Sequence, residues 1–78
     1  MISGDLLVRK FPVGSRVKLI ESRYAEEQLV DFGLKTGSVG TITGHDADFS
    51  AIIVRWDESD SNMGLIFGYD RFSLVFGR

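Results

Sequence analysis

The sequence of 78 residues contains no cysteine. This excludes disulfide bonds and thiolate metal sites, which often stabilise secreted domains of this size. We therefore expect a reducing, cytoplasmic setting. The longest apolar runs, Ala51–Val54 and Leu65–Phe67, are far shorter than the roughly 20 residues that a transmembrane helix needs, and no signal peptide is evident. The sequence thus predicts no membrane association.

Side chains that could carry out catalysis are equally scarce. An active site needs a nucleophile, a base or metal ligands that converge, and the chain has a single histidine, His45. Together with Asp46 and Asp48 it could form a metal or acid/base site. The polar, turn-rich residues around it favour a solvated hairpin tip instead. We therefore predict a protein that is not an enzyme and needs no cofactor or metal.

An excess of basic residues is also absent. Nine lysines and arginines are outnumbered by eleven carboxylates, giving a net charge of −2. A protein that binds nucleic acid mainly through its phosphates is usually basic, so nucleic acid is not the favoured partner. Arg16, Lys18 and Arg55 could still contact nucleic acid from the outer faces of strands.

Glycine is abundant and punctuates the chain. Nine glycines and one proline leave segments that suit strands of about 5–6 residues. β-branched residues and alternation of polar with apolar residues support the same interpretation. The predicted strands cover residues 16–20, 37–44, 51–57, 63–67 and 73–76. Their inward side chains are predicted to be Val17, Leu19, Ile42, Ile52, Val54 and Leu65.

The connections between these strands differ in length. Residues 24–32 contain good helix formers and predict a short helix or a long ordered loop. Residues 45–50 and 57–62 are polar and predict hairpin loops. We therefore predict an all-β fold, a small five-stranded SH3-like barrel covering residues 13–78, with the helix or long loop between its first two strands. Residues 1–12 are expected to form a tail or an edge strand.

Four blocks of sequence occur in an order that is typical of one family. They are Val13–Ile20, Gly37–Thr43, Ile52–Asp57 and Gly64–Phe72. They resemble the pattern G-x-R-V-x-L-I, P-G-x-x-G-T-V, V-x-W-D and L-I-P-G-x-D-x-F of a family of small bacterial and phage domains, the domain-of-unknown-function family 4314. The second and third blocks are also similar to KOW-type and mind-bomb-type SH3-like barrels.

The chain departs from this family pattern at two positions. Thr36 and Phe67 stand where the pattern has proline, and Phe67 adds an aromatic residue near a candidate contact surface. The resemblance implies a barrel fold and an origin in a bacterium, phage or mobile element. It implies no activity.

The candidate contact residues are aromatic or charged and lie near predicted turns. They are Trp56, Phe49, Phe67, Tyr69, Asp57 and Arg55. Aromatic side chains dominate many interfaces because each buries about 150–250 Å². Two of the candidates have another interpretation: Trp56 could close one end of the core, and Asp57 could belong to a solvated acidic loop.

These observations favour a binding module that contacts another protein or serves as an assembly factor. One alternative is a nucleic-acid-associated, KOW-like barrel. Another is a homo-oligomeric structural protein in which Leu6–Val8 or Val75–Phe76 pairs with a second copy. Salt-dependent binding of nucleic acid and the oligomeric state distinguish the three.

Overall fold

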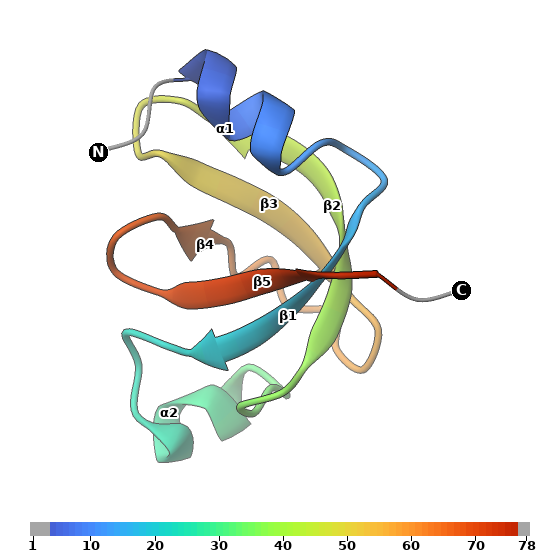
Figure 1. Cartoon of the computed structure of the whole chain (residues 1–78). Helices are drawn as coiled ribbons and strands as arrows, with labels where there is room; N and C mark the ends of the chain where they lie inside the picture. The colour runs from blue at the N-terminus through green and yellow to red at the C-terminus, as the bar shows by residue number, and fades with distance from the viewer. Residues whose placement is uncertain (1–3, 77–78) are drawn as a thin grey trace.

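A computed structural model describes residues 4–76 and shows one antiparallel sheet of five strands with two short helices (Figure 1). In chain order the elements are α1 (Gly4–Lys10), β1 (Arg16–Glu21), α2 (Glu26–Asp31), β2 (Val39–Asp46), β3 (Ala51–Trp56), β4 (Leu65–Ile66) and β5 (Arg71–Val75). The prediction of a small, mostly β domain with five strands and a short helix between the first two is confirmed.

The strands are arranged in the order β4-β3-β2-β1-β5, so β4 and β5 are the two edges of the sheet. Each neighbouring pair is antiparallel. Within residues 4–76 no ladder joins β4 to β5, and only an isolated bridge between Phe67 and Asp70 spans the turn that connects them. The sheet is therefore not closed by backbone pairing.

The core lies on the concave side of this curved sheet. All six side chains predicted to point inward are buried, with exposed fractions of 3% or less. Four of the six lie at every second position of β1 and β3, as the alternation of side chains along a strand requires. Burial of each such side chain stabilises the fold by about 1.5–3 kcal/mol.

The N-terminal segment differs from the prediction, because residues 4–10 form helix α1 rather than a tail or an edge strand. Asp5 lies in its first turn and Arg9 and Lys10 lie in its last, which suits the helix dipole. Leu7 is fully buried in the core. A helix of this length is not stable alone, and the burial of Leu7 therefore holds it in place. Residues 1–3 lie outside the described part of the chain.

Helix α2 is shorter than the predicted 24–32 but occupies the same place. Leu29 is its buried side chain. The helix ends because Gly33 adopts a positive φ of 74°, which favours glycine. The N–H of Gly33 donates to Val30 O, and that of Leu34 donates to Leu29 O, each at 2.9 Å. This double cap directs the chain back toward β2.

The predicted loop at residues 45–50 is also shorter than expected, because β2 continues through Asp46. His45 is therefore a half-buried strand residue and not a solvated hairpin tip. Its Nε2 lies 2.5 Å from Phe11 O and ties the segment after α1 to the sheet. In residues 4–76 no cluster of histidine and carboxylate groups is arranged to hold a metal ion. None of the described helices has the length and apolar character needed to cross a membrane.

Candidate functional site

The six predicted contact residues do not form one surface. Arg55, Trp56 and Asp57 lie at the end of β3. Phe67 and Tyr69 lie on the turn between β4 and β5 and line a different hollow. The sixth, Phe49, belongs to the loop between β2 and β3.

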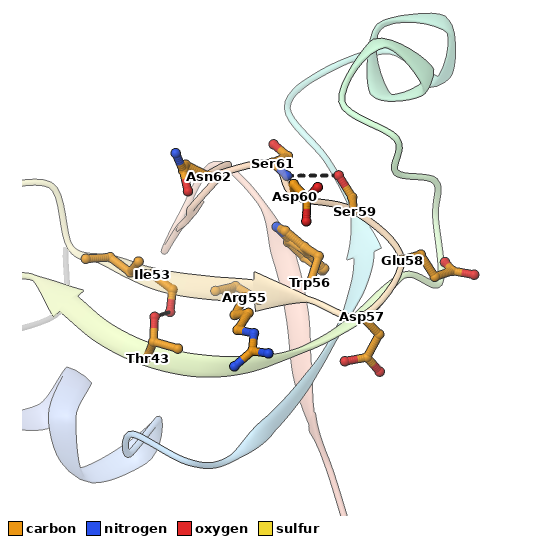
Figure 2. Close-up of a pocket in the computed structure, with 11 residues that line it drawn as sticks. Thr43, Ile53, Arg55, Trp56, Asp57, Glu58, Ser59, Asp60, Ser61 and Asn62 are labelled. Carbon is orange, nitrogen blue, oxygen red and sulfur yellow. Dashed lines mark hydrogen bonds between the residues drawn. The ribbon is translucent and has the colours of Figure 1, made fainter.

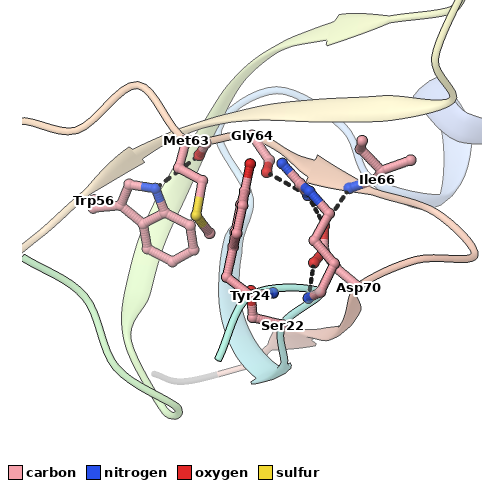
Figure 3. A network of polar contacts seen from close by, with 8 residues as sticks. Ser22, Tyr24, Trp56, Met63, Gly64, Ile66 and Asp70 are labelled. Carbon is pink, nitrogen blue, oxygen red and sulfur yellow. Dashed lines mark hydrogen bonds and ion pairs between the residues drawn. The ribbon is translucent and has the colours of Figure 1, made fainter. Parts of the chain in front are cut away.

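Trp56 is a core residue and is not available to a partner. Only 4% of it is exposed, and its indole N–H donates to Met63 O at 2.9 Å (Figure 3). The ring is buried and its single polar group is satisfied, as is usual for tryptophan inside a domain. The assignment of Trp56 to a contact surface is therefore wrong, and the alternative, that it closes one end of the core, agrees with its position.

A polar hollow of about 600 Å³ lies beside this residue. Figure 2 shows the side chain of Trp56 pointing toward residues 59–62 of the following loop. The side chains of Arg55 and Asp57 point to the opposite side of the strand. Asp57 accepts a hydrogen bond of 2.8 Å from Nη1 of Arg16 and a second from its Nη2. The same Nη1 donates to Oγ1 of Thr41 at 3.0 Å. The ion pair between Arg16 and Asp57 neutralises the charges of both side chains.

The Arg16–Asp57 pair gives a pH-dependent prediction. Hydrogen bonding from Arg16 is the main reason that the pKa of Asp57 lies below its ordinary 3.8. A lowered pKa in the folded state means that the stabilisation is present above pH 3.8 and is lost as the pH falls through the folded-state pKa. We expect Asp57→Asn to be less stable than the wild type in urea near pH 7, and equally stable near pH 2.

Asp60→Asn is the matched control, because Asp60 is an exposed carboxylate on the same loop with no ion pair in the described chain. At neutral pH, Asp60→Asn should lower the urea midpoint less than Asp57→Asn does. An Asp57→Asn deficit that is the same at both pH values would contradict this assignment.

The more apolar hollow, which we call the aromatic cleft, has a volume of about 320 Å³ and is lined by Phe11, Phe67, Gly68, Tyr69, Asp70, Arg71 and Phe72. Phe67 is 40% exposed and Tyr69 is 74% exposed. The rings of Phe11 and Phe72 pack together at a centroid distance of 5.1 Å and form its deeper wall. Sequence reasoning missed Phe11, because only the position of α1 brings it to this turn.

Buried Asp70 fixes the turn that carries Phe67 and Tyr69. Its side chain is fully buried and accepts hydrogen bonds from the N–H groups of Arg23, at 2.7 Å, and Ile66, at 2.8 Å (Figure 3). It also forms an ion pair with the Arg23 guanidinium, which donates to Gly64 O at 3.4 Å. The aspartate of the last family block thus organises the turn. No pattern in the sequence identifies Arg23 as the partner of Asp70.

Phe49 lies apart from the aromatic cleft. It is 63% exposed and lines a separate hollow of about 240 Å³ with Ile53 and Ile66. Phe49 does not line the aromatic cleft. It is therefore an exposed aromatic residue against which the effects of Tyr69 can be compared.

The fold and these sites define a small sheet domain with an aromatic cleft. A family model described as "Domain of unknown function (DUF4314)" matches residues 5–75, and the chain belongs to this family. The match begins at residue 5, within α1, so nearly all of this helix lies inside the family domain. No curated protein and no solved structure matches the chain.

Proposed function

We propose that this protein is a non-enzymatic binding module, built as an SH3-like barrel, that binds another polypeptide through the aromatic cleft. Support for the barrel comes from the seam between β4 and β5. There the bridge between Phe67 and Asp70 and the ion pair of Asp70 with Arg23 hold the start of β5 close to the end of β4.

The exposure of two aromatic side chains on a fixed turn is the observation that carries the proposed function. Phe67 and Tyr69 remain accessible, although burial of either ring would stabilise the fold. The network around Asp70 holds their backbone in one conformation. A preorganised aromatic surface loses little conformational entropy when it binds, which favours recognition.

The lining of the cleft indicates the chemistry of the ligand. Its walls are four aromatic rings, and Arg71 at its rim forms an exposed ion pair of 3.7 Å with Glu21. Such a hollow accepts an apolar or aromatic side chain. The neighbouring edge strand β5 offers backbone groups to an extended segment that presents this side chain.

The electrostatics of the outer face give little support to nucleic acid as the partner. Of the three cations that point outward from β1 and β3, Arg16 is already bound to Asp57. Lys18 and Arg55 remain as two dispersed charges. A phosphate-binding surface needs more positive charge than these two residues provide.

Substitution of Tyr69 tests the proposed function. Peptides selected from a random display library on the immobilised protein should carry an aromatic or large aliphatic anchor. Tyr69→Ser should weaken their binding about tenfold or more in fluorescence anisotropy, because a truncated hot-spot ring typically costs that much affinity. Phe49→Ser should leave binding unchanged.

Equal losses for the two variants, or peptides without such an anchor, would contradict the proposed function. Labelled DNA and RNA are included in the same assay near 50 mM salt. Binding of either that is insensitive to Tyr69→Ser would favour the nucleic-acid alternative instead.

A further inference from the structure

The two edges of the sheet are protected to very different degrees. Edge strand β4 has only two residues, and side chains bind backbone groups in it and just before it. Asp70 accepts from the N–H of Ile66 in the strand, and Arg23 donates to the carbonyl of Gly64, which precedes the strand. A short edge whose hydrogen-bonding groups are already occupied cannot readily pair with another strand.

The opposite edge strand, β5, has no such protection. It has five residues and pairs only with β1, and residues 4–76 make no other hydrogen bond to its backbone. Its sequence, Arg71-Phe72-Ser73-Leu74-Val75, contains no proline and one charge. Exposed edges of this kind are templates for strand addition unless they are blocked.

Phe76 projects from the far end of this free edge. It is 89% exposed and directly follows β5. The two-residue alternation of a strand places it on the same side as Phe72 and Leu74. Phe72 lines the aromatic cleft at the start of β5. A projecting aromatic ring and an aromatic hollow thus lie at opposite ends of one edge, with about 13 Å of strand between Phe72 and Phe76.

We propose that the partner of the aromatic cleft is a second copy of this chain. The two β5 strands pair antiparallel about a twofold axis near the middle of the strand, and Phe76 of each copy enters the cleft of the other. A twofold axis requires a surface that complements itself. The ring and the hollow provide this complementarity, because antiparallel pairing brings the end of one β5 beside the start of the other.

The charges on β5 are compatible with this pairing. Arg71 is the only charged residue of the strand and lies at its start. Antiparallel pairing keeps the two arginines at opposite ends of the interface, so no like charges face each other. The inward side chains Phe72 and Leu74 of the two copies then lie on one continuous face.

Sedimentation equilibrium of the wild type and of single variants tests the proposal. We expect a concentration-dependent dimer whose association constant falls about thirtyfold in Phe76→Ser, as for loss of a hot-spot aromatic side chain. Phe76 is too exposed to contribute to folding, so the urea midpoint of the variant should be unchanged. Tyr69→Ser should also weaken the dimer, whereas Phe49→Ser should not.

A mixture of ¹³C-labelled and unlabelled protein provides a second measurement. Isotope-filtered NOEs should connect the ring of Phe76 in one copy with Phe72 or Tyr69 in the other. A strict monomer up to about 1 mM, or a dimer that tolerates Phe76→Ser, would overturn the proposal.

The dimer rests on the proposed function but can fail separately from it. If the protein is monomeric and still binds selected peptides in a Tyr69-dependent manner, the cleft is a binding site and the second copy is not its ligand. If Tyr69-dependent peptide binding is absent as well, both proposals are wrong.

Discussion

Gly40→Ala is expected to lower the free energy of unfolding by about 3 kcal/mol, as measured by urea denaturation. Gly40 lies in β2, opposite Val17 of β1 and Trp56 of β3. A Cβ atom there would lie 2.5 Å from Cγ1 of Val54, 2.7 Å from the carbonyl oxygen of Arg55 and 3.1 Å from Cα of Trp56. Two of these atoms belong to the backbone and can move only if the β2–β3 ladder shifts.

Gly44→Ala in the same strand is the matched control. A Cβ at residue 44 would lie 3.4 Å from Cδ1 of Ile53, the end of a flexible side chain. We expect its stability to remain within about 1 kcal/mol of the wild type, since alanine also restricts the unfolded chain. If the two variants were equally stable, the close approach of the β2 and β3 backbones would not explain why residue 40 is glycine.

Asp70→Asn is expected to cost about 3 kcal/mol of stability, with little change in side-chain volume. The carboxylate accepts two backbone N–H groups and pairs with Arg23 in a fully buried position. An amide removes the charge and turns an NH₂ donor toward groups that are themselves donors. The arginine then loses its counter-ion, and the turn carrying Phe67 and Tyr69 loses its restraint.

Urea denaturation and hydrogen exchange at Ile66 measure this effect. The amide of Ile66, which donates to Asp70, should lose protection in Asp70→Asn. Asp31→Asn, at an exposed position on α2, serves as the control and should change stability little. Full stability of Asp70→Asn would mean that the turn is held by other contacts.

Sequence periodicity was sufficient to predict the core faces of β1 and β3. Val17 and Leu19, like Ile52 and Val54, recur every second residue, and a half-buried strand needs no further information to orient them. The glycine-bounded β2 was equally recognisable. The strands β4 and β5 were less well bounded, because turn geometry and not residue pattern sets where they begin.

The remaining features depend on contacts between distant residues. Three apolar residues, Leu6-Leu7-Val8, show no helical period, and α1 exists because Leu7 reaches the core. Phe11 joins the aromatic cleft only through the placement of that helix. Trp56 is equally compatible with a core and a surface position in the sequence, and its hydrogen bond to Met63 O decides between them.

The strand order also bears on how the chain folds during synthesis. Strand β1 must pair with β5, and the pair Arg16–Val75 joins residues near the two ends of the chain. Until residue 75 has left the ribosome, one side of β1 has no partner, although β2 and β3 can already form a hairpin. Because contacts this distant in sequence form slowly, we expect the incomplete nascent chain to be the species most prone to mispairing.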